Sequence, residues 1–342
     1  MEQTHAITLN DLPPPPPGRT GWPWDVAGAP TPAAMPDGSP WPRISVVTPS
    51  YNQGRYLEET IRSVLLQGYP NLEYFVMDGG SRDESGEIIR KYAPWITGWV
   101  SERDRGQSDA IAKGFDRATG ELIAWLNSDD LYVPDALTGI AMARQQHPDA
   151  ILAGHVINFL DGAGKETLIV QSGIALEHMV KYWEGRYRWH QPGLFFPRSA
   201  YQQAGGMDIT LQYAMDHDLV CRLLACGTPL AYVDRVLARF RLHAVSKTCS
   251  QQQGMILETS RVSQRYWSLV GEVKQADHDA YVFGELFRHA AANLLAGRPT
   301  QARELMRLAY APERGVTPWS APSALWRYAG WRIGRFRRFA TQ

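Results

Sequence analysis

The chain has 342 residues, which is enough for one large domain with an appendage. Its 35 basic and 35 acidic side chains balance, so the net charge predicts neither a nucleic-acid-binding surface nor an acidic substrate. The three cysteines argue against a disulfide framework, and the sequence has neither an apolar N-terminal leader nor an apolar run of about 18 residues. Together these features predict a cytoplasmic protein.

Residues 1–42 are rich in proline, with an unbroken run at Pro13–Pro17. Proline has no backbone N–H to donate and fixes its own φ angle, so this stretch predicts an irregular arm rather than a helix or a strand. Three tryptophans, Trp22, Trp24 and Trp41, leave two alternatives open. Either the arm is disordered, or it lays these side chains on the surface of the domain that follows.

Residues 43–130 alternate between apolar strands and amphipathic helices. The expected strands are 44–47, 72–77, 96–100 and 122–126, and each is followed by a segment that reads as a helix. Alternation of this kind predicts an α/β fold, with a parallel sheet that carries helices on both faces. In such sheets ligands bind outside the carboxyl ends of the strands.

Each of these strands ends in polar or glycine-rich sequence, namely TPSYN, DGGS, SERD and NSDD. The last of the four contains two adjacent acids, Asp129 and Asp130. Neighbouring carboxylates repel one another unless a cation binds them, and oxygen ligands suit Mg²⁺ or Mn²⁺ carrying a phosphate. The alternative is a polar loop in which Asp129 or Asp130 caps the helix that begins near Pro134. Four polar ends along one edge favour the metal site.

The second half of the chain is less regular. Further strands are expected at 150–159, 167–171, 193–197 and 230–237, a helix at 215–225, and helices after Gln251. The last segment, 322–342, has five arginines and no acid, and one helical face collects its apolar residues, Trp326, Ala329, Ile333, Phe336 and Ala340. A basic amphipathic helix can lie on the anionic inner face of a cell membrane. The alternative is a helix docked on the protein with its arginines in solvent.

With these residues placed, the sequence resembles the family 2 glycosyltransferases. The matching pieces, in the family's order, are VVTPSYNQGRYLEETIRSVLLQGYPN, FVMDGGSRDES, GQSDAIAKGFDRATGELIAWLNSDDLYVPDAL, GGMD, MDHDLVCRL and RLHAVSKT. The resemblance implies the GT-A fold over residues 43–250, with a nucleotide-binding half at 43–130 and an acceptor-binding half at 131–250. The arm of residues 1–42 and the helical extension of 251–342 lie outside it.

The resemblance also implies an activity and a site. It implies an enzyme that moves a sugar, with inversion, from a UDP- or GDP-type donor to a glycan or lipid-linked acceptor in surface polysaccharide biosynthesis, using Mg²⁺ or Mn²⁺. The implied metal ligands are Asp129, which matches the last Asp of the family's DXD motif, Asp130 beside it, and His243. Asp216 matches the family's catalytic base. The implied donor contacts are Thr48, Pro49, Ser50, Tyr51, Asp78, Asp109, Lys113, Asn127, Ser128 and Lys247, and the implied acceptor wall is Trp189 and Gln191.

The sequence departs from the family's pattern at two places. Asn127 replaces the first Asp of the DXD motif, which removes a charge but keeps a hydrogen-bonding group for the ribose. Ile111-Ala112 stands where many relatives have Arg-Asn, and this is why Asp109 and Lys113 are expected to contact the donor there.

Several of these residues also have a structural interpretation. Asp216 could be the N-cap of its helix, and Asp218 is the more structural acid of the two. Asp78 could belong to a simple glycine turn, His243 could be a structural histidine, and Trp189 could be a packing residue.

Three other functions are alternatives to the glycosyltransferase. A non-catalytic nucleotide-sugar sensor or scaffold would keep the fold and lose the chemistry. A sugar-nucleotide pyrophosphorylase needs a glycine-rich loop with Arg or Lys after the first strand, which TPSYNQG does not supply. A dinucleotide-dependent dehydrogenase is disfavoured because no G-x-G-x-x-G follows that strand.

Overall fold

The computed structural model describes residues 7–161, 164, 166–310 and 315–340. The chain divides into two compact units that interleave along the sequence. The first unit comprises Met1–Ser172, Trp189–Met215 and Arg222–His243, and the second comprises Gly173–Arg188, Asp216–Cys221 and Ala244–Gln342.

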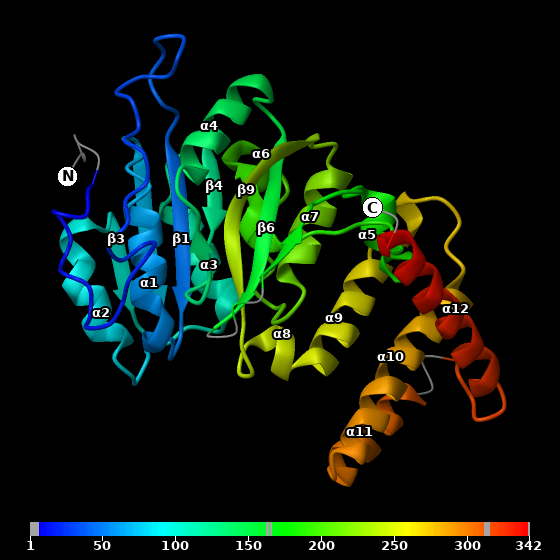
Figure 1. The fold of residues 1–342 in the computed structure, drawn as a ribbon. Coiled ribbons are helices and arrows are strands. Elements are labelled where there is room, and N and C mark those ends of the chain that lie inside the picture. The colour runs from blue at the N-terminus through cyan, green and yellow to red at the C-terminus, as the bar shows by residue number, and fades with distance from the viewer. Residues whose placement is uncertain (1–6, 162–163, 165, 311–314, 341–342) are drawn as a thin grey trace. The chain divides into compact units, whose positions relative to one another are not determined.

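The first unit is built on a mixed sheet. Its parallel half has the order β3-β2-β1-β4, from β1 (Ile44–Ser50), β2 (Leu72–Asp78), β3 (Gly98–Ser101) and β4 (Leu122–Trp125). Beyond β4 the order continues β8-β6-β9-β5, with β8 (Leu194–Pro197), β6 (Ile151–Leu160), β9 (Leu230–Leu242) and β5 (Leu131–Tyr132). Here β8 is antiparallel to both of its neighbours, and β7 (Glu166–Ile169) pairs with the outer part of β6. The parallel strands β6 and β9 lie side by side in Figure 1.

Helices cover both faces of this sheet, as the sequence predicts. They are α1 (Gly54–Leu65), α2 (Ser85–Tyr92), η1 (Ala93–Trp95), α3 (Gln107–Arg117), α4 (Ala136–Gln146), η3 (Gln191–Gly193) and α6 (Arg198–Gln203). Successive residues of a strand point to opposite faces, so Val46 packs with Leu57 and Ile61 of α1, while Val47 faces α3. A side chain at Gly114 of α3 would collide with Val47, so the close approach of helix and strand requires glycine there.

The expected α/β architecture is confirmed, with two differences of detail. β9 runs five residues beyond the predicted end at Leu237, and the two-residue strand β5 has no counterpart among the predicted elements. Both differences lie next to the polar end of β4, so they bear directly on the site.

The described part of the proline-rich arm, residues 7–42, packs against the rest of the first unit. Trp24 and Trp41 are both buried, and the indole N–H of Trp22 donates to the carbonyl oxygen of Tyr132 at 2.8 Å. The buried guanidinium of Arg62 in α1 donates to the carbonyl oxygens of Pro13, Pro23 and Trp24 at 2.7–3.0 Å. Because irregular backbone leaves its carbonyl groups open, one buried cation can bind three of them. Of the two alternatives, the docked arm is the one observed.

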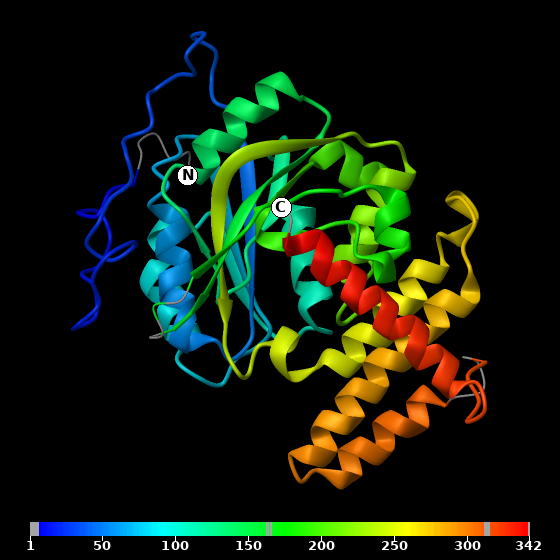
Figure 2. The same cartoon turned by 45° about the vertical axis from the view of Figure 1, so that its right-hand side comes forward.

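The second unit is mainly helical over its described residues, as predicted for the chain after Gln251. It contains α5 (Leu176–Val180), η2 (Tyr182–Glu184), α8 (Lys247–Ser250), α9 (Gln252–Gln264), η4 (Trp267–Leu269), α10 (Gln275–Leu295), α11 (Pro299–Ala309) and α12 (Ala321–Ala340). Figure 2 shows α10 and α11 as an antiparallel pair. Helix α7 (Met215–Ala225) contributes its residues 216–221 to this unit and its two ends to the first.

The apolar face expected for the C-terminal helix is not the face that docks. Ala321, Ala324 and Tyr328 of α12 are buried against α10, where the Tyr328 ring lies so close to Gly284 that any side chain at 284 would collide with it. Trp326, from the predicted face, is 81% exposed, and Ala329 is exposed as well. Small residues allow two helices to approach closely, which explains why the face with the alanines packs against α10 and the face with Trp326 does not. The side chains of Ile333, Phe336 and Ala340 lie outside those that the structure describes.

Candidate nucleotide and metal site

The polar ends of β1, β2 and β3 lie side by side. Ser50 is paired in register with Asp78, and Asp78 with Ser101. The N–H of Gly79 donates to the carbonyl oxygen of Ser50 at 2.8 Å, so the pairing continues into the turn after β2. β4 lies beside β1, and the N–H of Leu126 extends that pair by donating to the carbonyl oxygen of Val47. The predicted row of strand ends at one edge of the sheet is therefore present.

Asp78 is held by its own turn. Its carboxylate accepts hydrogen bonds from the backbone of Gly80 and Ser81 at 3.2 and 3.0 Å, and from the hydroxyls of Ser81 and Ser101 at 2.5 and 2.7 Å. The side chain is 2% exposed. Gly80 has a φ of +79°, in the left-handed region that favours glycine. The glycine turn and a fixed carboxylate are thus both present, and the predicted contact with a nucleotide base stays a prediction.

The TPSY segment has a buried part and an exposed part. The hydroxyl of Thr48 is bonded to the hydroxyl of Tyr74 at 2.9 Å inside the core. Pro49 and Ser50 are buried, and the Ser50 hydroxyl has no hydrogen-bond partner among the described residues. Tyr51 is 61% exposed at the end of the strand. A large exposed ring beside an unsatisfied buried hydroxyl suits a ligand that brings both a flat surface and a polar group.

After β4 the chain brings one predicted pair together. Asp129 and His243, 114 residues apart in sequence, meet with Oδ2 and Nε2 at 2.9 Å. The other ring nitrogen of His243 is buried and has no hydrogen-bond partner in the described part of the chain. The amide oxygen of Asn127 accepts a hydrogen bond from Gln107 Nε2 at 2.7 Å, and Ser128 is buried.

Asp130 has different surroundings from Asp129. It is fully buried, and its carboxylate accepts the backbone N–H of Arg241 at 3.0 Å, with Asn127 Nδ2 at 3.4 Å. Burial, reinforced by the charge of Asp129, raises the pKa of Asp130 well above its usual range. The hydrogen bond from Arg241 ties the Asp130 carboxyl group to β9. The predicted role of Asp130 as a metal ligand stays a prediction.

The alternative in which one of these acids caps the next helix is wrong. The N-cap residue of α4 is Asp135, and no side chain caps it. The two-residue strand β5 separates Asp129 and Asp130 from the helix.

Asp109 and Lys113, expected to contact the donor, are paired with each other on α3. Lys113 Nζ lies 3.2 Å from Asp109 Oδ2, and the guanidinium of Arg105 lies 2.8 Å from Asp109 Oδ1. Burial alone would raise the pKa of Asp109, but the hydrogen bonds of Arg105 and Lys113 outweigh burial and lower it. The carboxylate is therefore ionised and already paired.

Gln191 lies at the end of β4. Its Nε2 donates to the carbonyl oxygen of Trp125 at 2.8 Å, and its buried Oε1 has no hydrogen-bond partner among the described residues. The neighbouring Trp189 is half-buried. The open amide oxygen fits the predicted acceptor contact, which stays a prediction.

Asp216 and Lys247 belong to the second unit. Asp216 is the second residue of α7, whose N-cap is Ala214, so the N-cap interpretation of Asp216 is wrong. Its Oδ1 accepts the N–H of His217 at 2.7 Å. Burial raises the pKa of Asp216 to about 6, and the charge of Glu258 also raises it while Lys247, itself exposed, lowers it.

Asp218 has the structural role expected of it. It is fully buried and accepts hydrogen bonds from Tyr266 and Arg265 of the same unit at 2.9 and 3.1 Å.

Sequence reasoning missed the residues around Arg241. This side chain is 3% exposed and contacts Asp129, Glu59 and Asp161. The one available signal was an arginine two residues before His243 in a segment that resembles the family.

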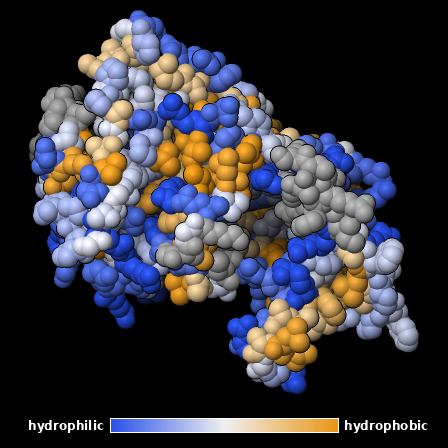
Figure 3. Space-filling model, viewed as in Figure 1, coloured by the Kyte–Doolittle hydropathy of each residue, from blue (hydrophilic) through white to orange (hydrophobic). Residues whose placement is uncertain are grey.

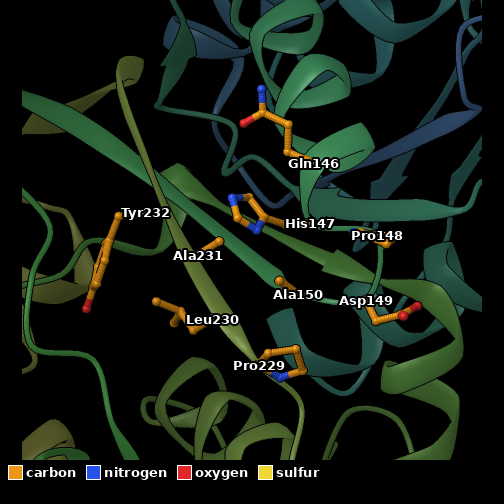
Figure 4. Close-up of a pocket in the computed structure, with 9 residues that line it drawn as sticks. All are labelled: Gln146, His147, Pro148, Asp149, Ala150, Pro229, Leu230, Ala231 and Tyr232. Atoms are coloured by element: carbon orange, nitrogen blue, oxygen red, sulfur yellow. The ribbon is translucent and has the colours of Figure 1, made fainter.

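A cavity of about 420 Å³ lies at the opposite end of the sheet. His147, Ala150 and Leu230 line it where β6 and β9 begin (Figure 4). β9 continues for 12 residues from Leu230 to Leu242, which is about 40 Å along the strand at about 3.3 Å per residue. The cavity is therefore separate from the Asp129–His243 pair.

The sheet and its row of polar strand ends define a GT-A-type α/β domain. Two solved structures share this fold. Staphylococcus aureus TarS 1–349 in complex with UDP is 16% identical, with a TM-score of 0.53, over 88% of this chain and 92% of that chain. The mannosyltransferase PcManGT from Pyrobaculum calidifontis, in complex with GDP-Man and Mn²⁺, is 20% identical, with a TM-score of 0.50, over 91% of this chain and 90% of that chain.

Residues 45–202 match the pattern of glycosyl transferase family 2. TuaG of Bacillus subtilis, a protein named for teichuronic acid biosynthesis, is 37% identical over 99 residues, which are 28% of this chain and 39% of TuaG. Uncharacterised glycosyltransferases of Rickettsia and Nostoc are 26–35% identical. The chain spans only 39–66% of the length of these last relatives. No helix in the described ranges is long and apolar enough to cross a membrane.

Proposed function

We propose that this protein is a metal-dependent, inverting glycosyltransferase that moves a sugar from a nucleotide-diphosphate donor to a glycan or lipid-linked acceptor. The observation that carries the proposal is the Asp129–His243 pair, next to the strand-end row that contains Asp78, in a family 2 domain. UDP in TarS and GDP-Man in PcManGT make both nucleotide types reasonable first donors. The teichuronic acid role in the name of TuaG supports surface polysaccharide biosynthesis as the process.

Asp129 and His243 fit a divalent cation. Two neighbouring ligands of an octahedral Mg²⁺ or Mn²⁺ site, each about 2.1 Å from the ion, lie about 3.0 Å apart. The Asp129–His243 separation of 2.9 Å is close to that value. The described residues contain no cluster of three or more acid, histidine or cysteine ligands, so substrate phosphates and water would complete the shell, as is usual for Mg²⁺. The Mn²⁺ bound in PcManGT supports this choice of metal.

The chain's own residues have distinct roles in the proposed transfer. Asp78 holds the nucleotide base through its fixed carboxylate, Asn127 meets the ribose, and Tyr51 lies along the nucleotide. A cation on Asp129 and His243 would stabilise the negative charge that develops on the departing nucleoside diphosphate. Asp216 takes the proton from the acceptor hydroxyl as that oxygen attacks the sugar from the side opposite the leaving group. The bond to the diphosphate breaks as the new glycosidic bond forms, which inverts the anomeric carbon.

A donor screen tests the proposal. Purified protein is incubated with UDP- and GDP-sugars and a glycan or lipid-linked acceptor, and release of nucleoside diphosphate is measured with and without EDTA. We expect release from one donor class, loss of release in EDTA, and recovery when Mg²⁺ or Mn²⁺ is added in excess. Release that persists unchanged in EDTA would contradict the metal mechanism. Tight donor binding without release under any condition would favour the scaffold alternative.

The C-terminal helix supports a second part of the proposal, contact with an anionic membrane at the cytoplasmic face. Trp326 is 81% and Trp319 95% exposed, beside a segment with five arginines. Figure 3 shows further apolar side chains over the end of the α10–α11 pair, where Leu295 is 91% exposed. Exposed tryptophan next to arginine is typical of interfacial helices. Contact with a membrane would suit an enzyme whose acceptor is linked to a lipid.

Liposome co-sedimentation tests the membrane contact. Full-length protein and a Trp319→Ser/Trp326→Ser double variant are pelleted with vesicles of anionic or neutral lipid. We expect the wild type to pellet with anionic vesicles in a salt-sensitive way and the variant to pellet several-fold less. Trp99→Ser, at a 37% exposed tryptophan of β3, is the matched control. Equal pelleting of all three proteins would contradict the contact.

A further inference from the structure

Arg241 connects the end of β9 to the loop that carries both acids. Its side-chain Nε donates to the carbonyl oxygen of Asp129 at 2.8 Å, and its backbone N–H donates to Asp130 Oδ1 at 3.0 Å. One residue therefore fixes two consecutive positions of a loop that is more than 110 residues away in sequence. Neither Asp129 nor Asp130 caps the next helix, α4, so a capping hydrogen bond does not fix this loop.

The guanidinium is anchored at its far end by two further acids. Arg241 Nη2 lies 2.9 Å from Glu59 Oε2 of α1, and Nη1 is bonded to Asp161, the residue after β6. The Arg241 side chain is 3% exposed. A buried cation is costly unless it is paired and hydrogen-bonded, and here three acceptors from three different segments surround it. The guanidinium therefore has one well-defined position.

Aromatic rings fix the plane of the same guanidinium and extend its reach to His243. Its central carbon lies 4.9 Å from the ring centre of Tyr56 and 4.6 Å from that of Phe159. The Tyr56 ring in turn lies 4.8 Å from the imidazole of His243. Arg241 thus contacts Asp129 directly and His243 through Tyr56, so it touches the surroundings of both predicted metal ligands.

We infer that Arg241 is a positioning residue that sets the geometry of the Asp129–His243 pair for cation binding. The inference rests on the proposed function, because it concerns the metal site of that function. Arg241, its acceptors, the two rings and the Asp129–His243 pair all belong to the first unit. Arg241 itself donates hydrogen bonds only and is not a metal ligand.

The chemistry of the site explains why arginine is needed there. A guanidinium presents five N–H donors in a rigid planar fork, so it can bond the Asp129 carbonyl, Glu59 and Asp161 at once while stacking on rings. A lysine ammonium keeps the charge but cannot reach all three acceptors in one plane. Arg241→Lys therefore separates charge from geometry, and Arg241→Met removes both while keeping the length of the side chain.

The test measures Mn²⁺ alone, by titration of full-length protein followed by the electron paramagnetic resonance of the free ion. Loss of a residue that orients metal ligands typically weakens metal affinity by about 10–100-fold. We expect a loss of that size in Arg241→Met, a somewhat smaller loss in Arg241→Lys, and kcat reduced in parallel with little change in the KM of the acceptor. Mn²⁺ stoichiometry near one in the folded variants separates this effect from a loss of folded protein.

Arg239→Met is the matched control. Arg239 lies two residues earlier on β9, its guanidinium also stacks on Phe159, and it pairs with an acid, Glu166. It has no contact with Asp129 or Asp130 among the described interactions. We expect its Mn²⁺ affinity to stay within about twofold of wild type.

The outcomes distinguish this inference from the proposed function. Wild-type protein that binds no Mn²⁺ would overturn the proposed metal site and the inference with it. Wild-type binding matched by unchanged binding in Arg241→Lys and Arg241→Met would overturn the inference alone. If Arg241→Met does not fold, Glu59→Gln removes one anchor and leaves Arg241 in place. A several-fold weaker Mn²⁺ affinity in that variant supports the inference, and an unchanged affinity contradicts it.

Discussion

Two acids at the same edge of the sheet are held in opposite ways. Asp78 receives four hydrogen bonds, three of them from residues within three positions of it and one from Ser101 on the next strand. Asp129 depends on His243, which is 114 residues away, and on Arg241 beneath it. The Asp78 turn is thus formed almost entirely by local sequence, whereas the Asp129 pair exists only when β9 is in place.

The two arrangements suit different tasks. A carboxylate that is already surrounded by N–H and O–H donors is fixed in position, which suits recognition of a neutral nucleotide base. A carboxylate oxygen that lies 2.9 Å from an imidazole nitrogen suits a divalent cation, which both groups can bind. The proposed mechanism therefore predicts that the two acids can be separated experimentally, with binding lost at one and turnover lost at the other.

The largest effect is expected for Asp129→Ala. Removing the carboxylate leaves His243 as the one ligand of the pair, and stabilisation of the leaving group by a cation is worth several kcal/mol. We expect kcat to fall by about 10³-fold while nucleoside-diphosphate affinity in the absence of metal stays within a few-fold. Stopped assays of sugar transfer and calorimetric binding measure the two quantities.

Asp149→Ala is the control for this variant, because it removes an acid that lines the cavity at the opposite end of the sheet. Its kcat should match the wild type. Wild-type turnover in Asp129→Ala would contradict the proposed role of Asp129 in catalysis, and with it the distinction between Asp129 and Asp78.

The two regions also differ in how far sequence alone could predict them. The DGGS turn after β2 could be predicted, since the glycines and the acid that form it are adjacent. The partners of Arg241 could not, because Glu59 lies 182 residues away and β9 was expected to end at Leu237. The segment ARFRL places two arginines on a strand, and nothing in that local pattern predicts that Arg239 is half-buried while Arg241 is buried.

The buried face of α12 could not be predicted from the sequence for a similar reason. The helical spacing in α12 favoured the face of Trp326, yet the buried face is that of Ala321, Ala324 and Tyr328. Hydrophobic periodicity ranks faces by their apolar side chains, whereas docking depends on shape. Here the Tyr328 ring packs against Gly284 of α10, where any side chain at position 284 would collide with it.

Asp216→Asn tests whether catalysis also depends on an acid outside the first unit. The amide keeps the size of the side chain but cannot accept a proton from the acceptor hydroxyl. General-base catalysis contributes about 10²–10⁴-fold, so we expect kcat to fall by at least about 10²-fold with donor affinity unchanged. A folded Asp216→Asn protein with full activity would refute the base role. Asp218→Asn, by contrast, should act on stability, because Tyr266 and Arg265 lose a buried acceptor.

The pH profile gives a separate check on Asp216. Burial raises its pKa to about 6, so the carboxyl is protonated below that pH and cannot act as a base. We expect log(kcat/KM) to be flat above about pH 7 and to fall by about one unit per pH unit below pH 6. This limb should be missing from the residual activity of Asp216→Asn. A wild-type limb near pH 4 would mean that Asp216 is not desolvated in the working enzyme.

The smallest effect is expected at Asp78. Asp78→Asn turns one acceptor oxygen into a donor that faces the N–H groups of Gly80 and Ser81, so the turn must shift. We expect nucleoside-diphosphate affinity to weaken by about tenfold and kcat at saturating donor to stay within about twofold, because the site of charge development is untouched.

Asp83→Asn is the matched control for Asp78→Asn. Asp83 also accepts backbone N–H groups, those of Gly54 and Ser85 at 2.9 and 3.1 Å, but has no expected part in donor binding. Both variants should lose similar stability in a thermal melt, and only Asp78→Asn should lose nucleotide affinity. Equal affinity in the two would mean that the Asp78 carboxylate serves its turn alone, and that recognition of the base lies elsewhere along the strand ends.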